Sequence, residues 1–164
     1  MSNNRRPRVQ QIRCWACHER PSQIRRPEDL LPLLWPEFTG ANLDSREKFG
    51  VVILDARHAP MAPPQTVSIG SLNASLVHPR EVFAPAIVAR AAAVIVYHNH
   101  PSGDPRPSAD DLELTGRLDR AGELLGLALL DHFILCPGDL HGESAKRAYT
   151  SIREYGWPAP PSNY

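Results

Sequence analysis

Three short apolar runs constrain the fold of this chain more strongly than any other feature of its sequence. They cover residues 49–55, 93–97 and 127–136, and they are rich in valine, isoleucine and leucine. Runs of this length and composition are typical of strands that are covered on both faces of a sheet. A weaker strand is expected at residues 66–69. Helical patterns separate the apolar runs, and this alternation predicts an α/β layer fold.

Three helices are predicted around these strands. The longest begins after Ser108, which can cap it, and ends near Gly126, with its leucines spaced along one face. Another covers residues 79–91. A short helix begins at Pro27, with acidic residues in its first turn, and Pro36 ends it.

Composition indicates one globular domain. The chain has 164 residues, of which 42% are hydrophobic and 22% charged, enough for a single compact core. No apolar run approaches the roughly 18 residues of a membrane span, and the arginine-rich start lacks the apolar segment of a signal peptide. We therefore expect a cytoplasmic protein with no membrane contact. Three cysteines do not form a disulfide framework.

Charge divides the chain into a basic arm and an acidic body. The first 26 residues hold seven arginines against one glutamate, although the whole chain has a net charge of zero. We expect residues 1–26 to form a flexible arm, residues 27–157 the domain, and residues 158–164 a disordered tail. The arm is either a solvated tail or a weak nucleic-acid contact. The arginines proposed for that contact are Arg5, Arg6, Arg8 and Arg13.

The turn after the strand at 93–97 carries most of the functional signal. His98 and His100 are two residues apart, so an extended backbone directs both imidazoles to one side, with Cα atoms about 6.5 Å apart. Pro101 favours that extended conformation, and Gly103 then helps to fold the chain back towards the next helix. The return brings Asp111 into range of both histidines.

Two interpretations of this turn are open. If Ser108 is the N-cap, Asp111 lies at the third helical position, where the pair forms an ordinary capping motif. The same position faces the sheet, however, and a buried carboxylate needs a cation or solvent beside it. Two histidines and one aspartate form a ligand set suited to zinc, with a fourth position left for water. The combination around one tight turn favours the metal site.

The pattern His98-x-His100, seven residues, Ser108-x-x-Asp111 resembles the signature of JAMM/MPN metalloproteins, and the surrounding residues resemble its bacterial RadC-like branch. Residues 70–83 and 130–134 are also similar to that branch. The resemblance implies the MPN (JAB/JAMM) fold, an α/β domain with a central mixed sheet flanked by helices. It further implies Zn²⁺ as the cofactor, held by His98, His100 and Asp111, and it places the family's general base on Glu47.

The function implied by the resemblance is zinc-dependent hydrolysis of a peptide or isopeptide bond in an unidentified substrate protein. Glu47 would take a proton from the attacking water, and Ser108 would hydrogen-bond the developing oxyanion. The alternative is a RadC-like DNA-associated or scaffold protein, in a DNA-repair or mobile-element context, with little or no hydrolytic activity. The substrate and the oligomeric state are left open.

Other histidines and cysteines are weaker candidates. Cys14, Cys17 and His18 have the spacing of a c-type haem attachment, which needs an exported chain, or of half a zinc site. Cys136 is expected to be a small buried residue. His78 and His132 either orient the site or satisfy backbone groups, and we keep both outside the catalytic set.

Overall fold

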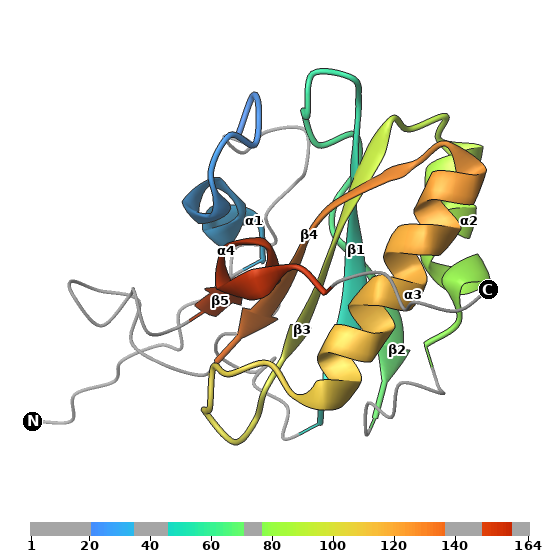
Figure 1. The fold of residues 1–164 in the computed structure, drawn as a ribbon. Helices are drawn as coiled ribbons and strands as arrows, with labels where there is room; N and C mark the ends of the chain where they lie inside the picture. The colour runs from blue at the N-terminus through green and yellow to red at the C-terminus, as the bar shows by residue number, and fades with distance from the viewer. Residues whose placement is uncertain (1–20, 35–45, 71–76, 137–148, 159–164) are drawn as a thin grey trace, which may run out of the picture.

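The computed structural model describes residues 21–34, 46–70, 77–136 and 149–158. These residues form one domain around a five-stranded sheet with the strand order β2-β1-β3-β4-β5 (Figure 1). The elements, in chain order, are the 3₁₀ helix η1 (Pro27–Leu30), α1 (Leu31–Leu34), β1 (Lys48–Leu54), β2 (Gln65–Ile69), α2 (Pro79–Val88), β3 (Ala93–Asn99), α3 (Ala109–Leu125), β4 (Ala128–Leu135), β5 (Tyr149–Ser151) and α4 (Ile152–Gly156).

The sheet is mixed. Strand β1 is antiparallel to both β2 and β3, β3 is parallel to β4, and β5 is antiparallel to β4. Parallel neighbours need a long crossover connection, which α3 provides between β3 and β4. The predicted α/β fold with a central mixed sheet flanked by helices is therefore confirmed. No helix among the described residues is long and apolar enough to cross a membrane.

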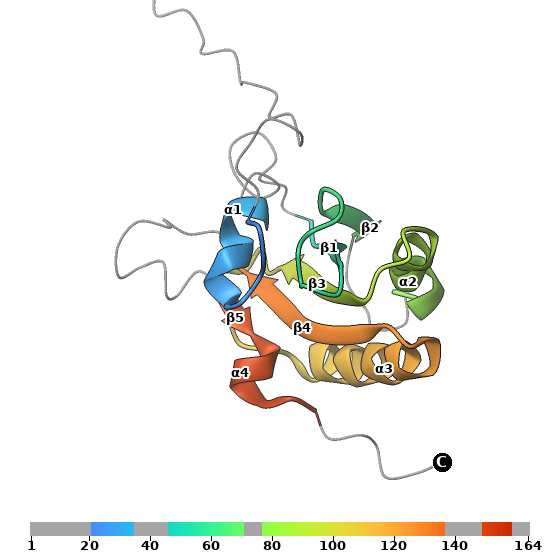
Figure 2. The same ribbon diagram turned by 90° about the horizontal axis from the view of Figure 1, so that it is seen from above.

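Helices α2 and α3 cover one face of the sheet (Figures 1 and 2). Apolar side chains from both helices pack there against alternate residues of the central strands, and this face holds the larger core cluster. Its buried members are Phe49, Val51, Ile53, Val77, Val82, Phe83, Ala86, Val94, Val96, Leu114, Leu118, Leu127 and Leu129.

The N-terminal segment covers the opposite face of the sheet. Leu30 and Leu34 are fully buried there beside Tyr97 and Phe133. Ile24 belongs to the same cluster, and its N–H donates to the carbonyl of His58 over 2.9 Å. Ile24 thus packs into the domain although it precedes Pro27, where the sequence analysis began the domain. The remainder of the basic arm, residues 1–20, lies outside the described residues.

Two features of the strands matter for the site, and the first differs from the sequence prediction. Strand β3 continues through Asn99, which places His98 inside the sheet rather than in the turn after it. In the pairing of β3 with β4, Val94 pairs with Leu129 but Ile95 pairs with Asp131, so one residue of β4 is extra, as in a β-bulge. Beyond this shift His132 faces the α3 side of the sheet.

Trp157 packs against the domain after α4. The indole Nε1 donates to Asp119 Oδ2 over 2.9 Å, and the Arg153 guanidinium lies 4.7 Å from the centre of the ring. Trp157 also packs against the core cluster under α3. Of the expected tail, residues 158–164, Pro158 is described and residues 159–164 lie outside the described residues.

Candidate metal centre

Three side chains meet at the end of the sheet where β3 stops and α3 begins. His98 lies in β3, His100 follows it, and Asp111 lies in the first turn of α3. One ligand atom from each lies within 4.8 Å of the others. His98 Nε2 is 2.9 Å from His100 Nε2 and 3.2 Å from Asp111 Oδ1, and His100 Nε2 is 3.4 Å from Asp111 Oδ2. We call these three residues the candidate metal centre.

The loop after β3 fixes the orientation of His100. Its Nδ1 lies 2.7 Å from the carbonyl oxygen of Asp104, and since a carbonyl has no proton, Nδ1 is the donor. The Nε2 lone pair therefore faces His98 and Asp111 in the neutral ring. Asp104 is held in turn by Arg106, whose guanidinium donates to both carboxylate oxygens and lowers the pKa of Asp104 to about 2. Gly103, at φ +78, closes the turn.

Asp111 is oriented by the start of α3. Ser108 is the N-cap, as predicted, and its hydroxyl and backbone N–H both donate to Asp111 Oδ2, over 2.6 and 2.7 Å. Asp111 returns a hydrogen bond from its own N–H to Ser108 Oγ over 3.1 Å. Burial opposes ionisation of Asp111, but its contacts with His100 and His98 and the hydrogen bond from Ser108 outweigh it and hold the pKa of Asp111 well below its usual value.

Glu47 lies just before β1, at the same end of the sheet. Asn99 secures this segment, because its Oδ1 accepts from the Lys48 N–H over 2.7 Å and its Nδ2 donates to the Arg46 carbonyl over 3.2 Å. The Asp111 hydrogen bond is the largest of the effects that raise the pKa of His100, and the charge of Glu47 adds to it. The Glu47 carboxylate is thus close enough to the candidate metal centre to act on it electrostatically.

Two further side chains, His132 and Thr115, complete the group; His132 was kept outside the predicted catalytic set, and no role was predicted for Thr115. His132 Nε2 is 2.8 Å from His98 Nδ1, and His132 Nδ1 is 2.7 Å from Thr115 Oγ1. His132 is fully buried, and this burial lowers its pKa well below the usual value, so the ring is neutral. Of the two interpretations left open for His132, the contact with His98 supports an orienting role. His78 is the N-cap residue of α2, and its side chain makes no capping hydrogen bond.

The donor set fits a divalent metal. Nitrogen, nitrogen and carboxylate oxygen suit zinc, and ligands of a tetrahedral zinc ion lie about 3.3 Å from one another. The contacts of 2.9, 3.2 and 3.4 Å are close to that spacing. Both histidines have their outer nitrogens engaged, which is the usual arrangement for imidazoles that bind a metal. The group thus could hold a metal, and its donors do not identify which one.

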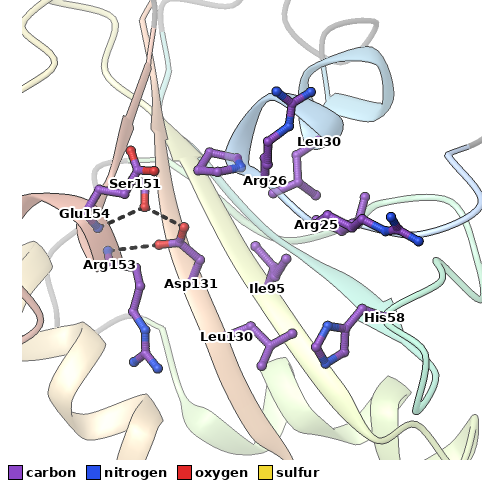
Figure 3. A pocket seen from close by; sticks show the side chains of 12 residues that line it. Arg25, Arg26, Leu30, His58, Ile95, Leu130, Asp131, Ser151, Arg153 and Glu154 are labelled. Carbon is purple, nitrogen blue, oxygen red and sulfur yellow. Dashed lines mark hydrogen bonds between the residues drawn. The ribbon is translucent and has the colours of Figure 1, made fainter.

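A cavity of about 260 Å³ lies on the opposite face of the sheet, between the N-terminal segment and α4 (Figure 3). Asp131 lies in its wall and accepts hydrogen bonds from the Ser151 hydroxyl and from the backbone N–H groups of His132 and Arg153. The guanidinium groups of Arg25, Arg26 and Arg153 point in different directions (Figure 3). Because these cations do not converge, we assign no anion site to this cavity.

Several sequence candidates lie outside the described residues. They are the arginines proposed for nucleic-acid contact, Arg5, Arg6, Arg8 and Arg13, and the group Cys14, Cys17 and His18. Cys136 is described and buried, as expected, and burial raises the pKa of its thiol to about 11. A thiol with so high a pKa is a poor nucleophile at neutral pH.

Comparison with known proteins places the chain in a family. The profile of the RadC-like JAB domain matches residues 24–157. A UPF0758 protein of Caldanaerobacter subterraneus subsp. tengcongensis is 50% identical over 120 residues, which are 73% of this chain and 49% of the relative. A UPF0758 protein of Methanosarcina mazei is 41% identical over 135 residues, or 82% of this chain and 53% of the relative.

A third relative, a UPF0758 protein of Halalkalibacterium halodurans, is 45% identical over 133 residues, or 81% of this chain and 52% of the relative. The chain thus spans about half the length of the curated relatives it matches. The profile match covers the whole sheet, both helices packed on it and all three residues of the candidate metal centre. The chain belongs to the RadC-like JAB domain family.

Proposed function

We propose that this protein is a zinc-dependent hydrolase of the JAMM type that cleaves a peptide or isopeptide bond. The observation that carries the proposal is the meeting of His98, His100 and Asp111 at one end of the sheet. When bound there, zinc would polarise a substrate carbonyl and make water more acidic. The residues around the centre supply the other functions that amide hydrolysis needs.

Glu47 is the general base in this proposal. It lies on the segment that Asn99 ties to the end of β3, and its charge acts on His100. A carboxylate in that position can accept a proton from the attacking water and later deliver it to the leaving amine. This role requires that Glu47 does not itself bind the metal. His98, His100 and Asp111 supply three ligands, so Glu47 is not needed as one.

Ser108 is the oxyanion donor in this proposal. Its hydroxyl now donates to Asp111 Oδ2, which also accepts from the Ser108 backbone N–H. The hydroxyl can therefore turn towards a substrate oxygen while Asp111 keeps one hydrogen bond from the same residue. One preorganised donor of this kind contributes about 10²–10³-fold to the turnover number of an amide hydrolase.

The test measures zinc content and hydrolysis together. Wild type should bind about one zinc per chain, the stoichiometry expected for a single three-ligand site, and His98→Ala/His100→Ala should lose it. The zinc-loaded protein should cleave members of a pooled set of fluorogenic peptides and lysine ε-linked isopeptides. Glu47→Gln should keep the zinc and lose the cleavage, whereas Glu113→Gln, an exposed glutamate on α3, should change neither.

Three results would contradict the proposal. Zinc retained by the double histidine variant would place the metal elsewhere in the chain. Cleavage by Glu47→Gln at the wild-type rate would remove the proposed base, and no cleavage by fully loaded wild type would favour the scaffold alternative.

A second candidate function is association with nucleic acid through the basic arm. The observation behind it is the excess of arginine in the first 26 residues. A gel-shift titration of the full chain with duplex DNA, repeated with Arg5, Arg6, Arg8 and Arg13 replaced by alanine, tests it. Binding that weakens steeply with salt and disappears in the replaced chain is the expected result, and no binding at low salt would remove this candidate.

A further inference from the structure

We propose that Thr115 and His132 act as positioning residues that hold the proton of His98 on Nδ1, so that Nε2 presents a lone pair to the metal. The inference rests on the metal centre of the proposed function but not on hydrolysis. It concerns a chain of four groups that runs from the backbone of α3, across β4, to the buried histidine of β3.

The chain begins at the Thr115 hydroxyl, which has two polar neighbours and one proton. Thr115 Oγ1 is 2.6 Å from the carbonyl oxygen of Asp111 and 2.7 Å from His132 Nδ1. Donation from a helical threonine to the carbonyl four residues earlier is a common contact. The carbonyl cannot donate, so when the hydroxyl proton points to Asp111, His132 Nδ1 must supply the proton of the second contact.

The position of the proton on His132 determines the position of the proton on His98. The neutral ring has one proton, so with Nδ1 as the donor its Nε2 is an acceptor. That Nε2 lies 2.8 Å from His98 Nδ1, which must then be the donor. His98 in turn has no proton on Nε2, the atom that faces His100 and Asp111.

The reverse order is incompatible with metal binding. If the Thr115 hydroxyl donated to His132, His132 Nε2 would donate to His98 Nδ1, and the His98 proton would move to Nε2. That proton would point at Asp111 Oδ1, 3.2 Å away, and would occupy the position of the metal. The hydroxyl contact with the Asp111 carbonyl favours the metal-compatible order, and it also ties the helix that supplies Asp111 to the strand that supplies His98.

Burial leaves no substitute for these partners. Thr115 and His132 are 0% exposed and His98 is 1% exposed, so solvent does not replace a lost hydrogen bond. The rings are also held in place by Phe49, which is stacked on His98 at 6.2 Å and meets His132 edge-on at 5.4 Å. The order of protons, rather than movement of the rings, is therefore the remaining variable.

The direct test is the position of the His132 proton. In the full chain, labelled with ¹⁵N-histidine and measured first without metal and then loaded with zinc, long-range ¹H–¹⁵N spectra distinguish a protonated ring nitrogen from a bare one. We expect His132 to be protonated on Nδ1 and bare on Nε2, and His98 to be protonated on Nδ1. A proton on His132 Nε2 in the metal-free chain would overturn the proposal, because there the metal does not impose the order, and this measurement requires no variant to fold.

The second test compares two substitutions at one position. Thr115→Val keeps the shape and removes the hydroxyl, whereas Thr115→Ser keeps the hydroxyl. In competition with a chromophoric chelator, we expect Thr115→Val to bind zinc about 10–100-fold more weakly than wild type, the range typical of lost outer partners of metal ligands. Thr115→Ser should retain most of the affinity, with its His132 proton still on Nδ1.

The outcomes separate this inference from the proposed function. Equal zinc affinity of Thr115→Val and wild type, or equal weakening in Thr115→Ser and Thr115→Val, would overturn the role of the hydroxyl while the metal centre stands. Absence of zinc from wild type would overturn both proposals. A zinc-loaded protein with the expected proton order and no hydrolysis would overturn the proposed function alone.

Discussion

Ser108 and Asp111 bind each other in both directions at the first turn of α3. The Ser108 hydroxyl donates to Asp111 Oδ2 over 2.6 Å, and the Asp111 N–H donates to Ser108 Oγ over 3.1 Å. The first bond orients a residue of the candidate metal centre, and the second caps the helix. The same pair therefore contributes to the stability of α3 and to the geometry of the site, and the two contributions can be measured separately.

Ser108→Ala should destabilise the metal-free protein. The substitution removes the N-cap acceptor and one hydrogen bond to a buried carboxylate, and loss of an N-cap serine lowers the free energy of unfolding by roughly 0.5–2 kcal/mol. Urea unfolding of the metal-free chain measures the change. Ser108→Thr keeps a capping hydroxyl and should stay close to wild type, and an alanine variant as stable as wild type would contradict the importance of the cap.

Ser108→Ala should also separate capping from catalysis under the proposed function. With zinc bound and the fold checked by circular dichroism, the turnover number should fall by about 10²–10³-fold because the oxyanion loses a donor. Ser108→Thr should retain most of the activity. A zinc-loaded alanine variant that turns over substrate at the wild-type rate would limit Ser108 to the capping role.

Leu30→Ala should show that the N-terminal segment is part of the core. Leu30 is 1% exposed and packs on the face of the sheet opposite α3, so its truncation should lower the free energy of unfolding by about 2–5 kcal/mol. Leu124→Ala is the matched control, because Leu124 is 90% exposed at the end of α3. The control should change stability by no more than about 0.5 kcal/mol. Equal effects in urea unfolding would contradict the packing of this segment.

Local patterns in the sequence were sufficient to predict most of the elements. The apolar runs that became β1, β3 and β4 stand out by composition, and α3 by its capping serine and leucine spacing, since each signal lies within one element. The spacing of His98 and His100 was sufficient to predict that both imidazoles lie on one side, because that signal also lies within a short stretch of the sequence. Asp111 was predicted from its place in a helical turn, and the structure brings it to the two histidines.

The role of His132 was not predictable from local pattern, because it depends on how two strands pair. Leu129 faces the α3 side of the sheet, so simple alternation along β4 would send His132 to the other side. The extra residue at Leu130 reverses this, and His132 meets His98 instead. Packing of Ile24 was missed for a similar reason, since one apolar residue in a basic segment gives no period.

Gly50→Ala should be strongly destabilising. A Cβ at Gly50 would overlap the ring of Tyr97 and lie 2.7 Å from the carbonyl oxygen of Gln65, so β1 would have to move against both neighbouring strands. Overpacking of a core lowers the free energy of unfolding by about 1–3 kcal/mol. The loss at Gly50 should lie at the upper end of this range, because one of the atoms in the way belongs to the backbone and cannot easily move. Thermal and urea unfolding measure the loss.

Gly116→Ala, in contrast to Gly50→Ala, should stabilise the protein. Gly116 lies within α3, and among the described residues a Cβ there would meet Pro158 alone, at 3.9 Å. Alanine in a helix interior is more favourable than glycine by roughly 0.5–1 kcal/mol, so this variant should be slightly more stable than wild type. A Gly50→Ala variant as stable as Gly116→Ala would contradict the close approach of β1 to Tyr97.

The buried carboxyl of Asp131 should make the folded protein less stable as the pH rises from about 3.8. Burial is the largest influence and raises the pKa of Asp131 above 3.8, although hydrogen bonds from Ser151, Arg153 and His132 partly oppose it. A raised pKa means that the folded state holds this proton more tightly than the unfolded state. Stability is therefore lost as pH increases from about 3.8 through the folded pKa of Asp131.

The comparison with Asp131→Asn isolates this effect from other titrating groups. Asparagine can keep the pattern of bonds, because its oxygen can accept from the backbone N–H groups of His132 and Arg153 while its amide donates to Ser151 Oγ. Groups such as Asp111 titrate in both proteins and largely cancel in the difference. The free energy of unfolding of wild type minus that of the variant, measured in urea from pH 4 to pH 7, should decrease with pH. A difference that stays flat or increases would show that the hydrogen bonds to Asp131 fully compensate its burial.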